Sequence, residues 1–156
     1  MRKYLLHVLI ILFVFLLTPT VHVASYAGEI EDAKEYVRNN PDDADAHFYL
    51  GNAYGRSGKY EEAIKSFKQA LRIDPDYALA HCKLGVAYGI SGMRKEGMNS
   101  LKQAIRIDPR LPEAHYALGG GYVAEGDRSS ALEEYEILKE LDTEWANKLF
   151  NLIYRE

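Results

Sequence analysis

A period of 34 residues constrains this chain more than any other feature of its sequence. The segment "AHFYLGNAYGRSGK" begins at Ala46, and segments of the same pattern, "AHCKLGVAYGISGM" and "AHYALGGGYVAEGD", begin at Ala80 and Ala114. Later in the period, "LRIDP" at residues 71–75 is matched by "IRIDP" at residues 105–109. A fixed period of about 20–50 residues is the signature of a repeat architecture, in which each unit stacks on its neighbours. We therefore expect a stack of similar units.

Each period is predicted to hold two helices separated by a glycine-centred turn. Residues 44–57 carry small and apolar residues at helical spacing, and residues 60–73 place Ala63, Ile64 and Phe67 on one face. Asp74 and Pro75 end the second helix, because the residue before proline avoids helical dihedrals. The same pattern predicts helices at 78–91, 94–107, 112–125 and 128–141, one further helix before them at 28–39 and one after them at 144–155.

The pattern resembles the tetratricopeptide repeat, a helix–turn–helix unit of this length with a Leu-Gly-x-x-Tyr motif, later small and aromatic positions, and a terminal proline. The first repeat carries this motif as Leu50, Gly51, Tyr54, Ala63, Phe67, Ala70 and Pro75. The second repeat departs from it at Gly97 and Leu101, and the third at Leu138 and Thr143. The family's usual tryptophan is replaced by His47, His81 and His115.

The resemblance implies an all-α fold, a right-handed superhelical stack of helix–turn–helix repeats. It divides the chain into an N-terminal half-repeat helix at 28–43, repeats at 44–77, 78–111 and 112–143, and a C-terminal capping helix at 144–156. A capping helix is expected because a repeat at the end of a stack would otherwise expose the face meant for a neighbour.

The first 27 residues have the plan of a secretory signal peptide. Met1-Arg2-Lys3 is basic, Tyr4–Leu17 is nearly all apolar, and Ser25 and Ala27 are spaced as a signal peptidase requires. We expect cleavage after Ala27 and export to the periplasm or the medium. The alternative is an uncleaved anchor over residues 4–24, just long enough to span a bilayer, with the rest of the chain facing the periplasm.

Charge and cysteine content exclude several classes of function. The net charge is −4, and loss of Arg2 and Lys3 with the signal would make it −6, so neither nucleic acid nor an anionic membrane surface is an expected partner. Cys82 is the only cysteine, which rules out an intramolecular disulfide and a cysteine-based zinc cluster.

Three motifs suggest chemistry but do not support it. The three repeat histidines lie on helices packed roughly 8–10 Å apart, too far to share one metal ion, so each is expected to pack between helices. "GRSGKY" at residues 55–60 lacks the first glycine and the final Ser or Thr of a phosphate-binding loop. A nucleophile elbow follows a β-strand, but no strand is predicted before "GRSG" or "GISG". We expect no metal, no cofactor and no enzymatic activity, because no catalytic constellation converges.

The family resemblance also implies a concave groove, lined by the first helix of each repeat, that binds a peptide or helix of a partner protein. The family's groove positions correspond here to Asp45, Phe48, Asn52, Arg56, Leu79, Cys82, Val86, Ile90, Glu113, Tyr116, Gly120 and Val123. Some of these residues would instead pack on the terminal helices. One subtype holds a terminal carboxylate with basic residues, but Phe48, Glu113 and Ala117 stand where those are needed. We therefore expect recognition of an apolar or aromatic-bearing segment.

Two functions fit these features. The first is an exported scaffold or adaptor for protein–protein interactions. The second, by analogy of fold alone, is a dedicated chaperone or assembly subunit of an envelope complex for secretion, pilus formation or cytochrome maturation.

Three consecutive glycines, Gly119 to Gly121, are predicted to lie within a helix and not in a phosphate loop, because the same register is helical in the earlier repeats. Gly119 is the repeat glycine, shared with Gly51 and Gly85, where close packing leaves no room for a side chain. Gly120 removes a side chain from the predicted groove. Gly121 lowers helix propensity by about 1 kcal/mol relative to alanine.

Overall fold

The computed structural model describes residues 26–154. The predicted signal peptide, or anchor, falls almost entirely on residues 1–25, outside the described residues. Within the described part of the chain, no helix is long and apolar enough to cross a membrane.

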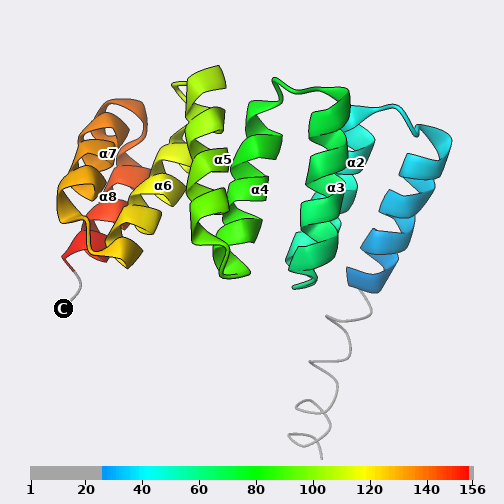
Figure 1. Ribbon diagram of the computed structural model, residues 1–156, viewed down its shortest axis with the longest axis horizontal. Coiled ribbons are helices and arrows are strands. Elements are labelled where there is room, and N and C mark those ends of the chain that lie inside the picture. The colour runs from blue at the N-terminus through cyan, green and yellow to red at the C-terminus, as the bar shows by residue number, and fades with distance from the viewer. Residues whose placement is uncertain (1–25, 155–156) are drawn as a thin grey trace, which may run out of the picture.

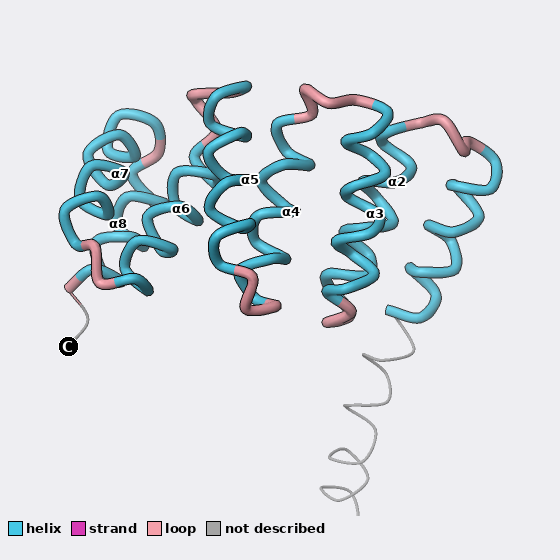
Figure 2. The backbone as a smooth tube through the Cα atoms, in the orientation of Figure 1, coloured by secondary structure: helices cyan, strands magenta, loops and turns pink. Residues whose placement is uncertain are grey.

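The described chain is a row of helices joined by short turns (Figures 1 and 2). After a helix at 26–39 come α2 (Ala44–Arg56), α3 (Tyr60–Ile73), α4 (Ala78–Ile90), α5 (Arg94–Ile107), α6 (Pro112–Glu125), α7 (Arg128–Leu141) and α8 (Thr143–Ile153). The predicted all-helical repeat stack is confirmed, and the predicted helix ends differ from the observed ones by at most two residues.

The apolar core is a series of local clusters between neighbouring helices. One joins α3 to α4 through Phe67 and Leu84. The next joins α5 and α6 to α4 through Leu101 and Leu118, and a further cluster, centred on Leu149, joins α7 to α8. Each repeat is therefore held by its neighbours, as the sequence period predicts.

The repeat glycines allow close helix packing. A Cβ atom added at Gly51 would lie 2.5 Å from the Phe67 ring, and one at Gly119 would lie 2.5 Å from Cδ2 of Leu149. At Gly85 the added atom would meet Leu101 at 2.7 Å and the carbonyl oxygen of Gly97 at 2.9 Å. The predicted close approach is confirmed. The glycine at 97, a departure from the family pattern, brings the backbones of α4 and α5 together.

The three repeat histidines make the same hydrogen bond. Nε2 of His47, His81 and His115 lies 2.9, 2.9 and 3.0 Å from the carbonyl oxygen of the proline six residues earlier in the chain. Since a carbonyl only accepts, each Nε2 carries the proton. These bonds fix the turn between one repeat and the next, and they give the histidines a structural role.

Candidate partner-binding groove

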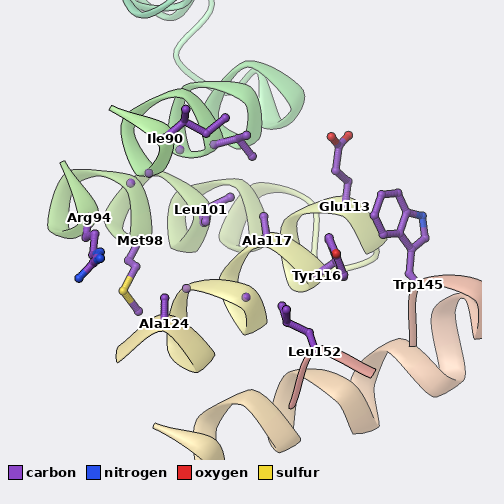
Figure 3. A pocket seen from close by; sticks show the side chains of 16 residues that line it. Ile90, Arg94, Met98, Leu101, Glu113, Tyr116, Ala117, Ala124, Trp145 and Leu152 are labelled. Carbon is purple, nitrogen blue, oxygen red and sulfur yellow. The ribbon is translucent and has the colours of Figure 1, made fainter. Parts of the chain in front are cut away.

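A large apolar pocket of about 410 Å³ lies between α4, α5, α6 and α8 (Figure 3). We call it the large pocket. It is lined by Gly85, Val86, Gly89, Ile90, Arg94, Gly97, Met98, Leu101, Glu113, Tyr116, Ala117, Gly120, Gly121, Ala124, Trp145 and Leu152. Its volume is within the range of about 300–1,000 Å³ that is usual for ligand sites.

Small residues hollow out this pocket, and α8 supplies large apolar side chains. A Cβ atom at Gly89 would meet nothing within 4 Å, and one at Gly120 would only reach van der Waals contact with Leu152 at 3.5 Å. The ring of Tyr116 packs on the indole of Trp145 with centroids 4.8 Å apart. The capping helix thus contributes to the candidate site as well as to stability.

Charged groups stand at the ends of the large pocket. Glu113 accepts a hydrogen bond from Nζ of Lys83 at 2.6 Å, and both side chains are about one-third exposed. Arg94 lies at the other end of the view in Figure 3, near Met98 and Ala124. Within residues 26–154, Arg94 makes no hydrogen bond or ion pair. The pocket therefore combines apolar walls with one exposed cation that forms no ion pair among the described residues.

A second pocket of about 230 Å³, the small pocket, lies one repeat closer to the N-terminus. It is lined by Asn52, Gly55, Arg56, Tyr60, Phe67, Lys83, Val86, Ala87 and Ile90. Val86 and Ile90 line both pockets, so the two adjoin, and we call them together the groove. Arg56 forms an ion pair with Glu29 of the first helix, and Lys83 is paired with Glu113, so both cations that line the small pocket are compensated.

The structure brings seven of the predicted groove residues to these pockets. They are Asn52 and Arg56 in the small pocket, Val86 and Ile90 in both, and Glu113, Tyr116 and Gly120 in the large pocket. Ile90 is 55% exposed, which leaves its side chain accessible from solvent.

Five predicted groove residues lie elsewhere. Asp45 accepts a hydrogen bond from the hydroxyl of Tyr77 at 2.6 Å, and Phe48 packs on the same ring with centroids 4.9 Å apart. Leu79 is 38% exposed but lines neither pocket. Val123 packs against the core cluster of α7 and α8.

Cys82 requires a correction, because its side chain has no exposed surface. It packs among Leu101, Ala104, Ala114 and Leu118, since α4, α5 and α6 converge at this point of the stack. Burial, and to a lesser degree the nearby Glu113 carboxylate, raises the pKa of its thiol to about 12. The residue is a protonated part of the core and does not reach the groove.

Sequence reasoning missed the contributions of α5 and α8. Arg94, Met98 and Leu101 come from the second helix of a repeat, whereas the prediction took groove residues from first helices only. Trp145 and Leu152 lie beyond the last repeat, where the period no longer assigns a position. The one available signal was the excess of glycine at 89, 120 and 121, which leaves space for side chains from other elements.

Comparisons with known proteins agree with the repeat fold. Two family models described as tetratricopeptide repeat match residues 33–65 and 78–111, and one described as TPR repeat matches residues 56–92. The chain therefore belongs to the tetratricopeptide repeat family. The search of curated proteins returned no match.

Several solved structures are similar. The MamA protein is 26% identical with a TM-score of 0.73, covering 84% of this chain and 73% of that one. A thermophilic repeat protein of Thermus thermophilus is also 26% identical with a TM-score of 0.73, covering 85% and 75%. The first repeat domain of Spaghetti, bound to an HSP90 peptide, is 23% identical with a TM-score of 0.65, covering 70% and 91%.

Proposed function

We propose that this protein is an exported scaffold that binds a segment of a partner protein in the groove formed by the small and large pockets. The observation that carries the proposal is the large pocket itself, an apolar hollow bordered by the exposed side chain of Ile90. A single connected groove over three repeats suits a peptide segment, because it offers consecutive sites for consecutive side chains.

Binding without catalysis is the function this groove supports best. The charged groups that line the large pocket are Arg94 and Glu113, and Glu113 is already paired with Lys83. In the described residues, no three His, Cys, Asp or Glu side chains gather to hold a metal ion. The similar Spaghetti domain, whose structure is bound to an HSP90 peptide, supports a peptide as the kind of partner.

Export is the second part of the proposal and rests on the sequence of residues 1–27. The basic start, the apolar run and the small residues at 25 and 27 support a cleaved signal. Mass measurement of the protein recovered from the envelope fraction tests it, since cleavage after Ala27 leaves a chain that begins at Gly28. A full-length mass with membrane association would instead support the anchor.

Crosslinking pull-down from the organism's own envelope fraction tests partner binding. Ile90→Asp introduces a charge into both pockets at an exposed position and is expected to abolish capture of the partner. Ile137→Asp is the matched control, because Ile137 is 42% exposed on α7 and lines neither pocket. Equal capture by the two folded variants would disprove groove binding. A stoichiometric complex favours a scaffold, and transient capture of unfolded clients favours an assembly chaperone.

A further inference from the structure

The two pockets are equivalent positions of consecutive repeats. Adding 34 to each of the nine residues that line the small pocket gives a residue that lines the large pocket. Asn52 corresponds to Val86, Arg56 to Ile90, and Lys83 to Ala117. The groove therefore presents the same site twice, with a different set of side chains each time.

The substitutions between the two sites change what each can hold. Hydrogen-bonding side chains of the small pocket are replaced by apolar ones in the large pocket, as in the pairs just named. Val86 and Ile90, which narrow the small pocket, become Gly120 and Ala124. The large pocket is accordingly wider and suits a large apolar side chain. The small pocket, whose cations are paired and whose lining includes the Asn52 amide, suits an uncharged side chain that can form a hydrogen bond.

One substitution runs in the opposite direction. Tyr60 of the small pocket corresponds to Arg94 of the large pocket, and this guanidinium has no partner among the described residues. Arg94 is the first residue of α5, whose N-cap Met93 provides no side-chain hydrogen bond. The Arg94 side chain is exposed, and Glu96 in the same first turn of α5 forms no ion pair with it among the described residues. A carboxylate beside the apolar side chain would therefore reach Arg94 and pair with it.

We infer that the groove binds one extended segment of a partner protein and recognises its side chains at two positions, an inference that rests on the proposed function. A large apolar side chain fills the large pocket, and an acidic side chain next to it binds Arg94. The small pocket takes an uncharged polar side chain three residues away. The spacing follows because packed helices lie about 8–10 Å apart, and three residues of an extended polyproline II segment, one full turn, span about 9 Å and return the side chain to the same face.

Selection of phage-displayed random 12-residue peptides on the immobilised full chain tests this inference. The expected consensus has Phe, Trp, Leu or Met adjacent to Asp or Glu, with Asn, Gln, Ser or Thr three residues from the apolar position. Arg94→Glu is expected to weaken the selected peptides about tenfold, the size of one charge-assisted hydrogen bond, and to redirect selection toward Lys or Arg. Lys95→Glu is the control, since it makes the same charge change at the next, exposed residue, outside both pockets.

A second variant tests the size of the large pocket. Gly120→Val with Ala124→Ile places the side chains of the small pocket into the large one, and selection on it is expected to lose the large apolar residue. Peptides whose binding is lost with Ile90→Asp bind the groove. If such peptides carry no such consensus, or if Arg94→Glu and Lys95→Glu weaken their binding equally, this inference alone is overturned. Failure to select any peptide that depends on Ile90 overturns the proposed function as well.

Discussion

At the scale of single residues, one of the three repeat histidines differs from the others. His115 is buried and, in addition to its bond to the Pro109 carbonyl, its Nδ1 lies 2.6 Å from Oε2 of Glu134. With Glu134 ionised, both ring nitrogens face acceptors, an arrangement that favours the charged imidazolium. Burial, the largest single influence, opposes the charge, but the hydrogen bonds to Glu134 and Pro109 and nearby carboxylates outweigh it and raise the pKa of His115.

This ion pair makes stability depend on pH. The pKa of His115 in the folded protein lies above its unfolded value of about 6.5. The contribution of the pair is therefore complete below pH 6.5 and is lost as the pH rises through the folded pKa. We expect the free energy of unfolding of the native protein, minus that of Glu134→Gln, to be about 1.5–3 kcal/mol at pH 6 and to fall at higher pH.

Urea denaturation between pH 5.5 and 9 measures this difference. His81→Gln is the control, because no carboxylate of residues 26–154 is bonded to Nδ1 of His81. If the difference in the free energy of unfolding between the native protein and Glu134→Gln is constant over this pH range, His115 stays neutral.

At the scale of single helices, α6 holds three consecutive glycines with different surroundings. Gly119→Ala is expected to destabilise the protein by about 1–3 kcal/mol, because its Cβ would overlap the buried side chain of Leu149. Gly120→Ala and Gly121→Ala are expected to stabilise it by up to about 1 kcal/mol each, since their added atoms would lie 3.5 and 3.4 Å from the nearest side-chain atoms. Thermal denaturation ranks the three variants, and a destabilising Gly121→Ala would contradict the assigned register.

The helix α8 depends on its N-cap. The carboxylate of Asp142 accepts hydrogen bonds from the amides of Glu144 and Trp145 at 2.9 and 3.1 Å. Asp142→Ala is expected to lower the free energy of unfolding by about 0.5–2 kcal/mol. Because Trp145 lines the large pocket, the substitution is also expected to weaken binding in the groove. Asp142→Asn is the control, since asparagine caps equally well. Chemical denaturation gives the stability, and tryptophan fluorescence reports on the only tryptophan, Trp145.

These helices also show how far sequence could predict the structure. Helix positions followed from the period, because Gly58, Gly92 and Gly126 adopt positive φ and end the first helix of each repeat. The pocket did not follow, because it depends on which side chains from distant elements fill the space left by glycine. Trp145 lies outside the period, and the burial of Cys82 depends on how three helices converge.

At the scale of the whole molecule, stability is distributed along the stack. The core consists of local clusters, and each helix packs mainly on its neighbours in the row (Figure 1). In such a stack, the ends open at lower free energy than the middle. We expect amide hydrogen exchange to be slowest in α4 and α5 and faster in the helix at 26–39 and in α8. Equal protection of all helices would show that the molecule opens only by global unfolding.

The proline–histidine hydrogen bonds have a consequence for length. Because the same bond recurs at each joint between repeats, the spacing of the small and large pockets is set by the protein and not by its partner. Under the proposed binding mode, the two anchoring side chains of a partner must be separated by this spacing. Inserting one residue between the two anchoring side chains of the partner would prevent them from entering both pockets at once. Binding would weaken although every contact residue is still present.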